Sequence, residues 1–180
     1  MKNVMIDLET MGQSPDAAIV AIGAVAFTTS RGDLMQFYRV VNLASSMAAG
    51  GQVDASTVMW WLRQDERARQ ALGERTVSIN EALGEFSRWF GLAGGKDTLV
   101  WGNGADFDLV VLGQAYRRLA IAPPWSFRNH RCFRTLRALR PDVEYKRPVD
   151  AHNALADARS QAEHACRILE AMGVALGEQP

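Results

Sequence analysis

The segment MIDLET near the start of the chain places two acidic residues, Asp7 and Glu9, in what otherwise reads as an apolar strand. Because side chains two positions apart on a strand point to the same face, these carboxylates project together while Ile6 and Leu8 face the other way. Isolated carboxylates are costly to bury, so such a pair requires a cation, strong hydrogen-bond donors or access to water. For this pair alone, the simplest interpretation is a solvated strand end.

Asp108 is a third acidic residue, and its position favours a buried site. It comes early in a predicted helix and heads a stripe that continues with Leu112, Ala115 and Leu119. The helical geometry that buries these side chains also directs the Asp108 carboxylate inward. Its alternative role is to cap the N-terminus of the helix, where a negative charge is favourable.

Asp157 and His152 supply a fourth acid and a base near the start of the last predicted helix. Asp157 lies about 60° from Ala154 around this helix, at the margin of an alanine stripe that lets the helix approach the sheet closely. His152 stands about 140° from Asp157 on a continuous helix, so the two share no helical face. The arrangement that joins them places His152 in the preceding loop and Asp157 inside the helix. Taken singly, either residue would be ordinary on a surface.

Three short segments, DLET, NGADFD and HNALADA, contain these residues in order along the chain. Together they resemble the three motifs of the DEDDh 3′-5′ exonucleases, a family of the ribonuclease H-like superfamily. The resemblance covers roughly residues 4–160 and is strongest with the small stand-alone prokaryotic and phage exonucleases and exoribonucleases, partly through the tryptophan pair in TVMWWL. It implies an α/β fold whose mixed central sheet, a three-strand antiparallel meander plus parallel strands, is flanked by helices.

The resemblance also implies a catalytic set that binds metal. Four carboxylates in one cleft would repel each other unless divalent cations neutralised them, and hard oxygen ligands suit Mg²⁺ or Mn²⁺. Two such ions about 4 Å apart assist the in-line cleavage of a phosphodiester. By resemblance, Asp7 bridges both ions, with Glu9 and Asp157 on the side of the nucleophile. Asp108 serves the other ion, and His152 is the general base, because a neutral imidazole can accept a proton around neutral pH.

Substrate-binding roles are expected for five further residues: Thr10, Met11, Gly12, Asn103 and Trp60. By resemblance, the turn formed by the first three approaches the terminal nucleotide, and Asn103 shapes the site. Met11 has packing against protein as its alternative role, and Asn103 has helix capping or a turn. Trp60 falls off the apolar stripe of its helix, so it is available to stack on a base or to contact a second subunit in a homodimer.

These features predict a metal-dependent 3′-5′ exonuclease that acts on a free 3′ end of RNA or DNA and releases nucleoside 5′-monophosphates. Two alternatives stay open: a nucleic-acid-binding module that keeps the fold without catalysis, and a polymerase-associated proofreading subunit. The complete set of five motif residues argues against the first alternative. No additional polymerase-binding domain is evident in the sequence, which argues against the second.

The elements that must position these residues are strands first and alternating strands and helices afterwards. Strands are expected over residues 3–8, 19–27, 34–41 and 98–101, with turns at 13–16 and 30–33 and an extended stretch near residue 127. Helices are expected over residues 54–72 (behind an N-cap at Asp54 or Ser56), 79–90, 107–119, 132–139 and 153–172. This order predicts a mixed sheet with helices on its faces.

Length and composition set the remaining expectations. A chain of 180 residues with 48% hydrophobic and 22% charged residues is expected to form one domain over residues 1–180, with a flexible tail from about residue 174. No apolar run approaches the roughly 20 residues of a membrane span and no secretory signal is evident, so we expect no membrane partner and a cytoplasmic location. Cys132 and Cys166 are interpreted as reduced packing residues.

Charge is distributed unevenly although the formal net charge is zero. Residues 117–147 hold nine Lys or Arg residues against the two acids Asp142 and Glu144. Nucleic-acid binding would therefore depend on local asymmetry rather than on overall attraction. Four arginines recur every three residues on one predicted helix: Arg131, Arg134, Arg137 and Arg140. They form either a face that tracks phosphates or an ordinary solvated face.

Overall fold

The computed structural model describes residues 2–28, 35–146, 148 and 152–174. The predicted turn at 30–33 and the predicted tail beyond residue 174 lie outside these ranges. The elements in chain order are β1 (Asn3–Thr10), β2 (Ile19–Phe27), β3 (Gln36–Val40), α1 (Leu43–Ala48), α2 (Ala55–Trp61), α3 (Glu66–Ala71), α4 (Ile79–Ala93), β4 (Leu99–Gly102), α5 (Asp108–Arg118), the 3-10 turn η1 (Phe127–Asn129), β5 (His130–Cys132), α6 (Phe133–Leu139) and α7 (Ala154–Ala171).

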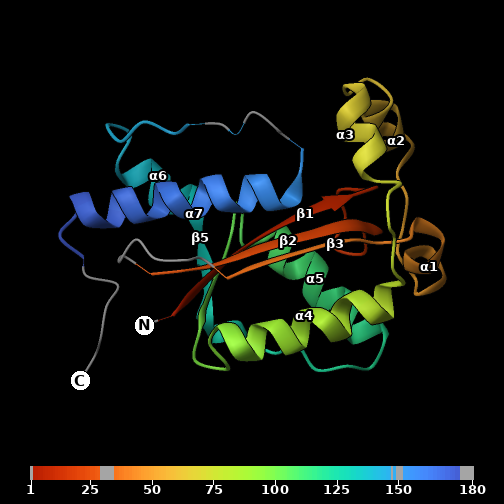
Figure 1. Ribbon diagram of the computed structural model, residues 1–180, viewed down its shortest axis with the longest axis horizontal. Coiled ribbons are helices and arrows are strands. Elements are labelled where there is room, and N and C mark those ends of the chain that lie inside the picture. The colour runs from red at the N-terminus through yellow and green to blue at the C-terminus, as the bar shows by residue number, and fades with distance from the viewer. Residues whose placement is uncertain (1, 29–34, 147, 149–151, 175–180) are drawn as a thin grey trace.

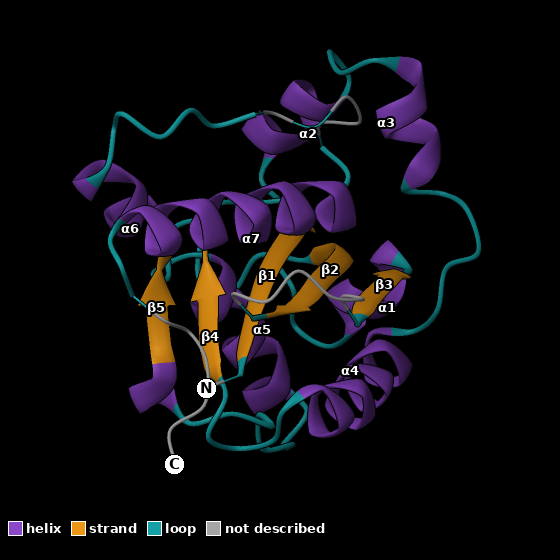
Figure 2. Ribbon diagram, turned by 60° about the vertical axis from the view of Figure 1, so that its left-hand side comes forward, coloured by secondary structure: helices purple, strands orange, loops and turns teal. Residues whose placement is uncertain are grey.

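A five-stranded mixed sheet forms the centre of the molecule, with strand order β3-β2-β1-β4-β5 (Figure 2). β2 pairs antiparallel with both β1 and β3, which confirms the predicted meander. β4 pairs parallel with β1 and with β5. β1 is therefore the middle strand, and its carboxyl end lies beside the carboxyl end of β4. The predicted α/β fold class is confirmed.

Side-chain alternation along β1 separates two layers of the core. Val4, Ile6 and Leu8 pack with residues of α4 and α5 on one face. Met5 packs with residues of α6 and α7 on the other face. Figure 1 shows α7, in blue, on one side of the sheet and α4 and α5, in green, on the other. Since Asp7 and Glu9 are in phase with Met5, they face α7.

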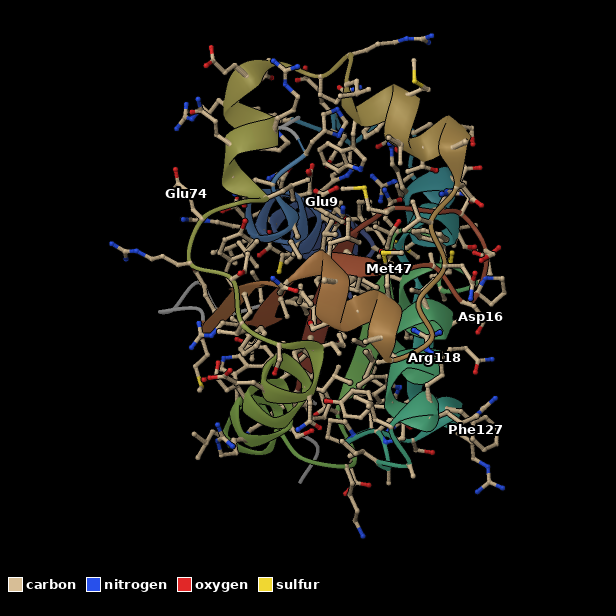
Figure 3. The ribbon with its side chains drawn as sticks, turned by 90° about the vertical axis from the view of Figure 1, so that its right-hand side faces the viewer. Glu9, Asp16, Met47, Glu74, Arg118 and Phe127 are labelled. Atoms are coloured by element: carbon tan, nitrogen blue, oxygen red, sulfur yellow. The ribbon has the colours of Figure 1, made fainter. Side chains whose placement is uncertain are left out.

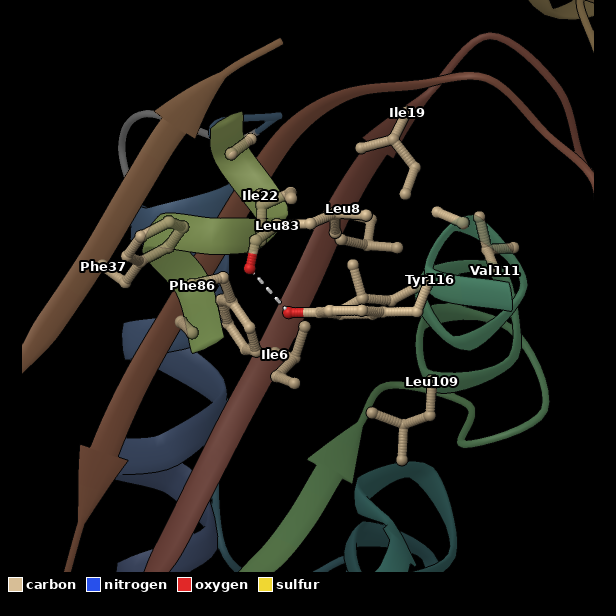
Figure 4. Packing of buried hydrophobic residues seen from close by; sticks show 14 of the residues in the cluster. Ile6, Leu8, Ile19, Ile22, Phe37, Leu83, Phe86, Leu109, Val111 and Tyr116 are labelled. Atoms are coloured by element: carbon tan, nitrogen blue, oxygen red, sulfur yellow. Dashed lines mark hydrogen bonds between the residues drawn. The ribbon is translucent and has the colours of Figure 1, made fainter. Parts of the chain in front are cut away.

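Tyr116 anchors α5 in the first of these layers (Figure 4). Its side chain is fully buried, and its hydroxyl donates a hydrogen bond of 2.9 Å to the backbone oxygen of Leu83 in α4. The same hydroxyl lies 2.8 Å from the Ser87 hydroxyl. Buried polar groups that are hydrogen-bonded fix the elements that carry them. The helix that begins at Asp108 is thereby held in place relative to the sheet.

The longest helix, α7, follows the predicted pattern closely. Ala154, Ala158, Ala162 and Ala165 are all fully buried, which confirms the alanine stripe. Met172, at the end of the helix predicted over residues 153–172, is exposed. In the described part of the chain, no helix is both long and apolar enough to cross a membrane.

The prediction of a single helix over residues 54–72 is wrong, because the structure contains two short helices there, α2 and α3. The Asp65 side chain accepts a hydrogen bond from the Ala68 backbone N–H, so it caps a new helix and ends the old one. Leu62, whose helical spacing from Val58 in the sequence predicts a place on the buried face, is exposed. α2 and α3 stand beyond the end of β1 (Figure 1), and the preceding helix α1 was not predicted.

The edge of the sheet beside β4 also differs from the sequence-based expectation. The extended stretch expected near residue 127 is the 3-10 turn η1, in which the Ser126 side chain accepts a hydrogen bond from the Arg128 backbone N–H. Extended backbone begins only at His130, where β5 pairs with β4. The helix predicted from residue 132 consequently begins one residue later, at Phe133.

Candidate active site

Three of the predicted acidic residues meet at the carboxyl end of β1. One carboxylate oxygen from each of Asp7, Glu9 and Asp157 lies within 4.8 Å of the other two. Asp157 comes from the first turn of α7, whose N-terminus favours negative charge. The pairing of β1 with β2 shifts register between Glu9 and Thr10, as is common where a strand ends beside a functional site. The structure thus brings together Asp7 and Asp157, which lie 150 positions apart in the sequence.

Asp108 lies outside this group of three, but near enough for its charge to act on Asp7 and Glu9, and it extends the hydrogen-bond ladder of the sheet. β4 ends at Gly102, so the backbone N–H of Leu8 has no partner on that strand. It donates instead to Oδ1 of Asp108 at 3.2 Å, while the backbone N–H of Asn103 donates to Oδ2 at 3.1 Å. Asp108 is buried, with 4% of its surface exposed. Its carboxylate is therefore fixed by backbone donors on both oxygens.

The environment of the cluster disfavours negative charge. For Asp7, burial is the largest cause of a pKa well above the usual range, followed by repulsion from the other three carboxylates. Burial raises the pKa of Glu9 to about 8, and the charges of Asp157 and Asp108 add to this increase. Burial also raises the pKa of Asp108 to about 7, against the effect of its backbone hydrogen bonds. A bound cation would oppose these increases and favour the ionised acids, and their oxygen donors suit Mg²⁺ or Mn²⁺.

Gln161 contacts the cluster and was not identified from the sequence. It lies one turn after Asp157 on α7, is 98% buried, and its Nε2 donates a hydrogen bond of 2.8 Å to Oδ1 of Asp7. This bond lowers the pKa of Asp7 and opposes the other contributions. The spacing of four residues from Asp157 is the only local signal that could have pointed to it.

Gly23 allows α7 to approach the sheet, and it too was missed. It pairs with Asp7 across β1 and β2. A Cβ atom at this position would lie 2.1 Å from the carbonyl carbon of Ala154 and 2.3 Å from the backbone nitrogen of Leu155. Only glycine leaves room for this contact. The first turn of α7, and with it Asp157, reaches β1 because this position has no side chain.

His152 occupies the loop immediately before α7, as predicted. Its backbone N–H donates a hydrogen bond of 2.9 Å to Oδ2 of Asp157. Its φ of +66° is in the left-handed region, which costs a residue with a Cβ about 1–3 kcal/mol. The ring packs edge-on against Trp60, with centroids 4.9 Å apart, and lies 6.4 Å from Trp61. Both contacts hold the imidazole against the two tryptophans of α2.

A pocket of about 430 Å³ opens beside Glu9. Its lining includes four residues of the predicted site: Glu9, Thr10, Gly12 and Trp60. Figure 3 shows Glu9 close to α7 and below α2 and α3. Trp60 is 41% exposed, whereas Trp61 is buried and donates a hydrogen bond from Nε1 to the backbone oxygen of Thr10 at 3.0 Å. α2 is thereby attached to the end of β1, and both tryptophans line the pocket.

Met11 and Asn103 do not line this pocket. The backbone N–H of Met11 donates to the backbone oxygen of Ala18, and its backbone oxygen accepts from Asp54, so this residue holds the turn after β1. Asn103 lies on the other side of the cluster, where its backbone N–H contacts Asp108. The structure therefore separates the five expected substrate-binding residues into a pocket group and two residues outside it.

The predicted row of arginines is engaged by the protein itself. Arg134 donates to the backbone oxygen of Asn103 at 2.9 Å, and the Arg137 guanidinium lies 4.9 Å from the centroid of the Tyr145 ring. Arg140 pairs with an acid of the next turn, and Arg131 donates to backbone oxygens. Each arginine of the row therefore contacts the protein, and the partner differs from one arginine to the next.

A mixed sheet of this order, with carboxylates gathered at the end of its middle strand, defines an α/β protein of the ribonuclease H-like fold. The structure is similar to the crystal structure of cell-death related nuclease 4 (CRN-4), with a TM-score of 0.55 and 12% sequence identity. The similarity covers 96% of this chain and 64% of that chain. Residues 2–169 match the family described as 3′-5′ exoribonuclease Rv2179c-like domain, and the chain belongs to this family. No curated protein matches the sequence.

Proposed function

We propose that this protein is a metal-dependent 3′-5′ exonuclease that removes nucleoside 5′-monophosphates from a free 3′ end of RNA or DNA. The observation that carries the proposal is the convergence of Asp7, Glu9 and Asp157 within 4.8 Å, with Asp108 held beside them. Membership of the exoribonuclease family supports the direction of digestion and makes RNA the first substrate to test.

The four carboxylates would hold two divalent cations, Mg²⁺ or Mn²⁺. When bound, such ions polarise the phosphodiester and lower the pKa of an attacking water. Asp7, which is assigned to both ions, is oriented by the Nε2 atom of Gln161. Asp108 is oriented by two backbone N–H groups, so it presents its remaining lone pairs without a change of rotamer. This support from neighbouring groups is what a metal site requires of its surroundings.

His152 is proposed as the general base. Its backbone N–H is hydrogen-bonded to Asp157, and its ring packs against Trp60, which lines the same pocket as Glu9. An imidazole at this place accepts a proton from water as the water attacks the phosphorus. The base and one metal ligand are thus set by the same turn at the start of α7.

The terminal nucleotide is proposed to occupy the pocket beside Glu9. Trp60 presents an exposed ring at its rim, where stacking on a base contributes about 1–3 kcal/mol. Thr10 and Gly12 form the adjacent wall, and the Thr10 hydroxyl donates to the backbone oxygen of Gly12 at 2.7 Å. Met11 keeps this turn in place from outside the pocket, and Asn103 supports Asp108 on the opposite side.

A cleavage assay tests this function. RNA and DNA oligonucleotides labelled at the 5′ or the 3′ end are incubated with Mg²⁺ or Mn²⁺, with an EDTA control, and the products are separated. The expected result is a ladder that shortens from the 3′ end, with nucleoside 5′-monophosphates as the released product. Internal cuts, or cleavage that continues in EDTA, would show that the proposal is wrong. Asp97→Asn, on an exposed turn, serves as the control for substitutions of the acidic cluster.

A further inference from the structure

We infer that a groove along the outer face of α5 binds the single-stranded segment that lies 5′ of the scissile bond. This inference rests on the proposed function. The groove has a volume of about 390 Å³ and lies between α5 and the segment that leads into β5. Its residues include Val110, Gln114, Arg117, Trp125, Phe127 and His130. We call it the α5 groove.

The α5 groove begins where the proposed terminal-nucleotide pocket ends. Phe107 lines that pocket, whereas Val110 lines the near part of the groove and Arg117 its far part. At 100° per residue, Phe107, Val110, Gln114 and Arg117 lie within about 80° of one another around the helix axis. The ten steps along the helix from Phe107 to Arg117 span about 15 Å, the length of about four stacked nucleotides. A strand whose 3′ end fills the pocket can therefore continue along this face of α5.

The far end of the groove carries an aromatic platform. Phe127 is 74% exposed, and Figure 3 shows it at the lower right of the molecule, away from Glu9. The Arg128 guanidinium lies 5.5 Å from the centroid of its ring. Trp125 lines the same groove, is buried and is fixed by a hydrogen bond of 2.9 Å from Nε1 to Nε2 of His130. An exposed ring flanked by a cation suits an unstacked base and its phosphate.

Charge selects nucleic acid as the occupant. Arg117 lines the groove and Arg128 flanks it, and among its described lining residues there is no carboxylate. Both belong to the basic segment 117–147. A second copy of this chain packed symmetrically on this groove would bring like charges together, which is unfavourable. A phosphate backbone is attracted by the same charges.

Binding measured by fluorescence anisotropy in EDTA tests the groove without cleavage. A labelled RNA dodecanucleotide and a trinucleotide are compared for the wild-type protein, for Phe127→Ala and for the double variant Arg117→Ala/Arg128→Ala. We expect the wild-type protein to favour the dodecanucleotide, and Phe127→Ala to reduce that preference about tenfold. The double variant should make the slope of log affinity against log salt less negative by about 1.4, for two phosphate contacts on a single strand.

A double variant on α4 is the matched control for the groove variants. Arg88→Ala/Leu92→Ala removes an exposed cation and an exposed apolar side chain from α4, and it should leave both quantities unchanged. The inference would be overturned if the wild-type protein bound both oligonucleotides equally well, or if the groove variants bound them as the control does. It would also be overturned if the groove variants lost the same affinity for both oligonucleotides. Failure of the proposed function is distinguishable, since it would appear as binding through Phe127 with no cleavage in Mg²⁺ or Mn²⁺. If the wild-type protein cleaves from the 3′ end but Phe127→Ala keeps the length preference, the inference about the groove is wrong and the proposed function still holds.

Discussion

Replacing Gly23 with alanine is expected to displace the first turn of α7 and to remove most of the activity. The new Cβ atom would lie 2.1 Å from the Ala154 carbonyl carbon, whereas ordinary contacts begin at 3.4 Å. The helix must therefore retreat by at least about 1.3 Å at this point, the difference between these two distances. β2 cannot absorb the change, because it is paired on both edges.

The displacement acts on the residues that this turn carries. Asp157 lies within 4.8 Å of Asp7 and Glu9, and His152 is hydrogen-bonded to Asp157, so both would leave their places together. A misplacement of about 1 Å at a catalytic centre costs about 100-fold in rate. The cost in stability should be about 1–3 kcal/mol, as for other overpacked positions, which leaves the protein folded.

The assay is kcat/KM for a labelled oligonucleotide, together with Mn²⁺ affinity by calorimetry and unfolding in urea. Gly91→Ala is the control, because Gly91 is in the interior of helix α4 and a Cβ there meets nothing within 4 Å. Alanine should stabilise that helix by about 0.5–1 kcal/mol and leave activity and affinity unchanged. If Gly23→Ala stays folded and as active as Gly91→Ala, close approach of α7 is not what positions Asp157.

Four other outcomes follow from the same geometry. Asp7→Asn should abolish cleavage, and a variant that only binds substrate more weakly would contradict its assignment to both ions. His152→Ala should lose most turnover yet keep Mn²⁺ affinity, so an unchanged turnover number would remove His152 from the mechanism. Gln161→Leu should weaken Mn²⁺ binding by about tenfold in calorimetry, through loss of the donor to Asp7; equal affinity would limit Gln161 to packing. Burial raises the pKa of Glu9 from its ordinary value of 4.5 to about 8 in the folded state, so the folded state holds the extra proton between these pH values. Metal-free protein should therefore lose stability as pH rises from about 5 to 8, by up to about 1.4 kcal/mol per unit, and Mg²⁺ should restore it; equal melting temperatures across this range would refute the electrostatic argument.

Much of the framework could be predicted from local patterns. Alternation along β1 set Asp7 and Glu9 on one face, because strand geometry leaves no other choice. The alanine spacing that starts at Ala154 predicted the buried stripe of α7, since the helical period determines which side chains share a face. The position of Asp108 at the head of an apolar stripe predicted its burial for the same reason.

The sequence-based prediction of helices and strands failed at two places where a single polar residue interrupts an apolar pattern. Residues 54–72 have helical spacing throughout, yet the Asp65 cap starts a new helix, and Leu62 turns to solvent. Near residue 127 the Ser126 hydroxyl closes a 3-10 turn instead of an extended stretch. In both places one side-chain hydrogen bond to the backbone outweighs the apolar pattern, because few tertiary contacts oppose it.

The sequence alone determined which chemistry is present: four carboxylates and an imidazole on elements whose faces follow from strand and helix periods. Only the tertiary structure decided how these groups are supported. Gln161 reaches Asp7 across a separation of 154 residues, and Gly23 matters because the backbone at Ala154 lies against it. Such contacts depend on how whole layers pack, and packing distance between remote segments leaves no periodic mark in either of them.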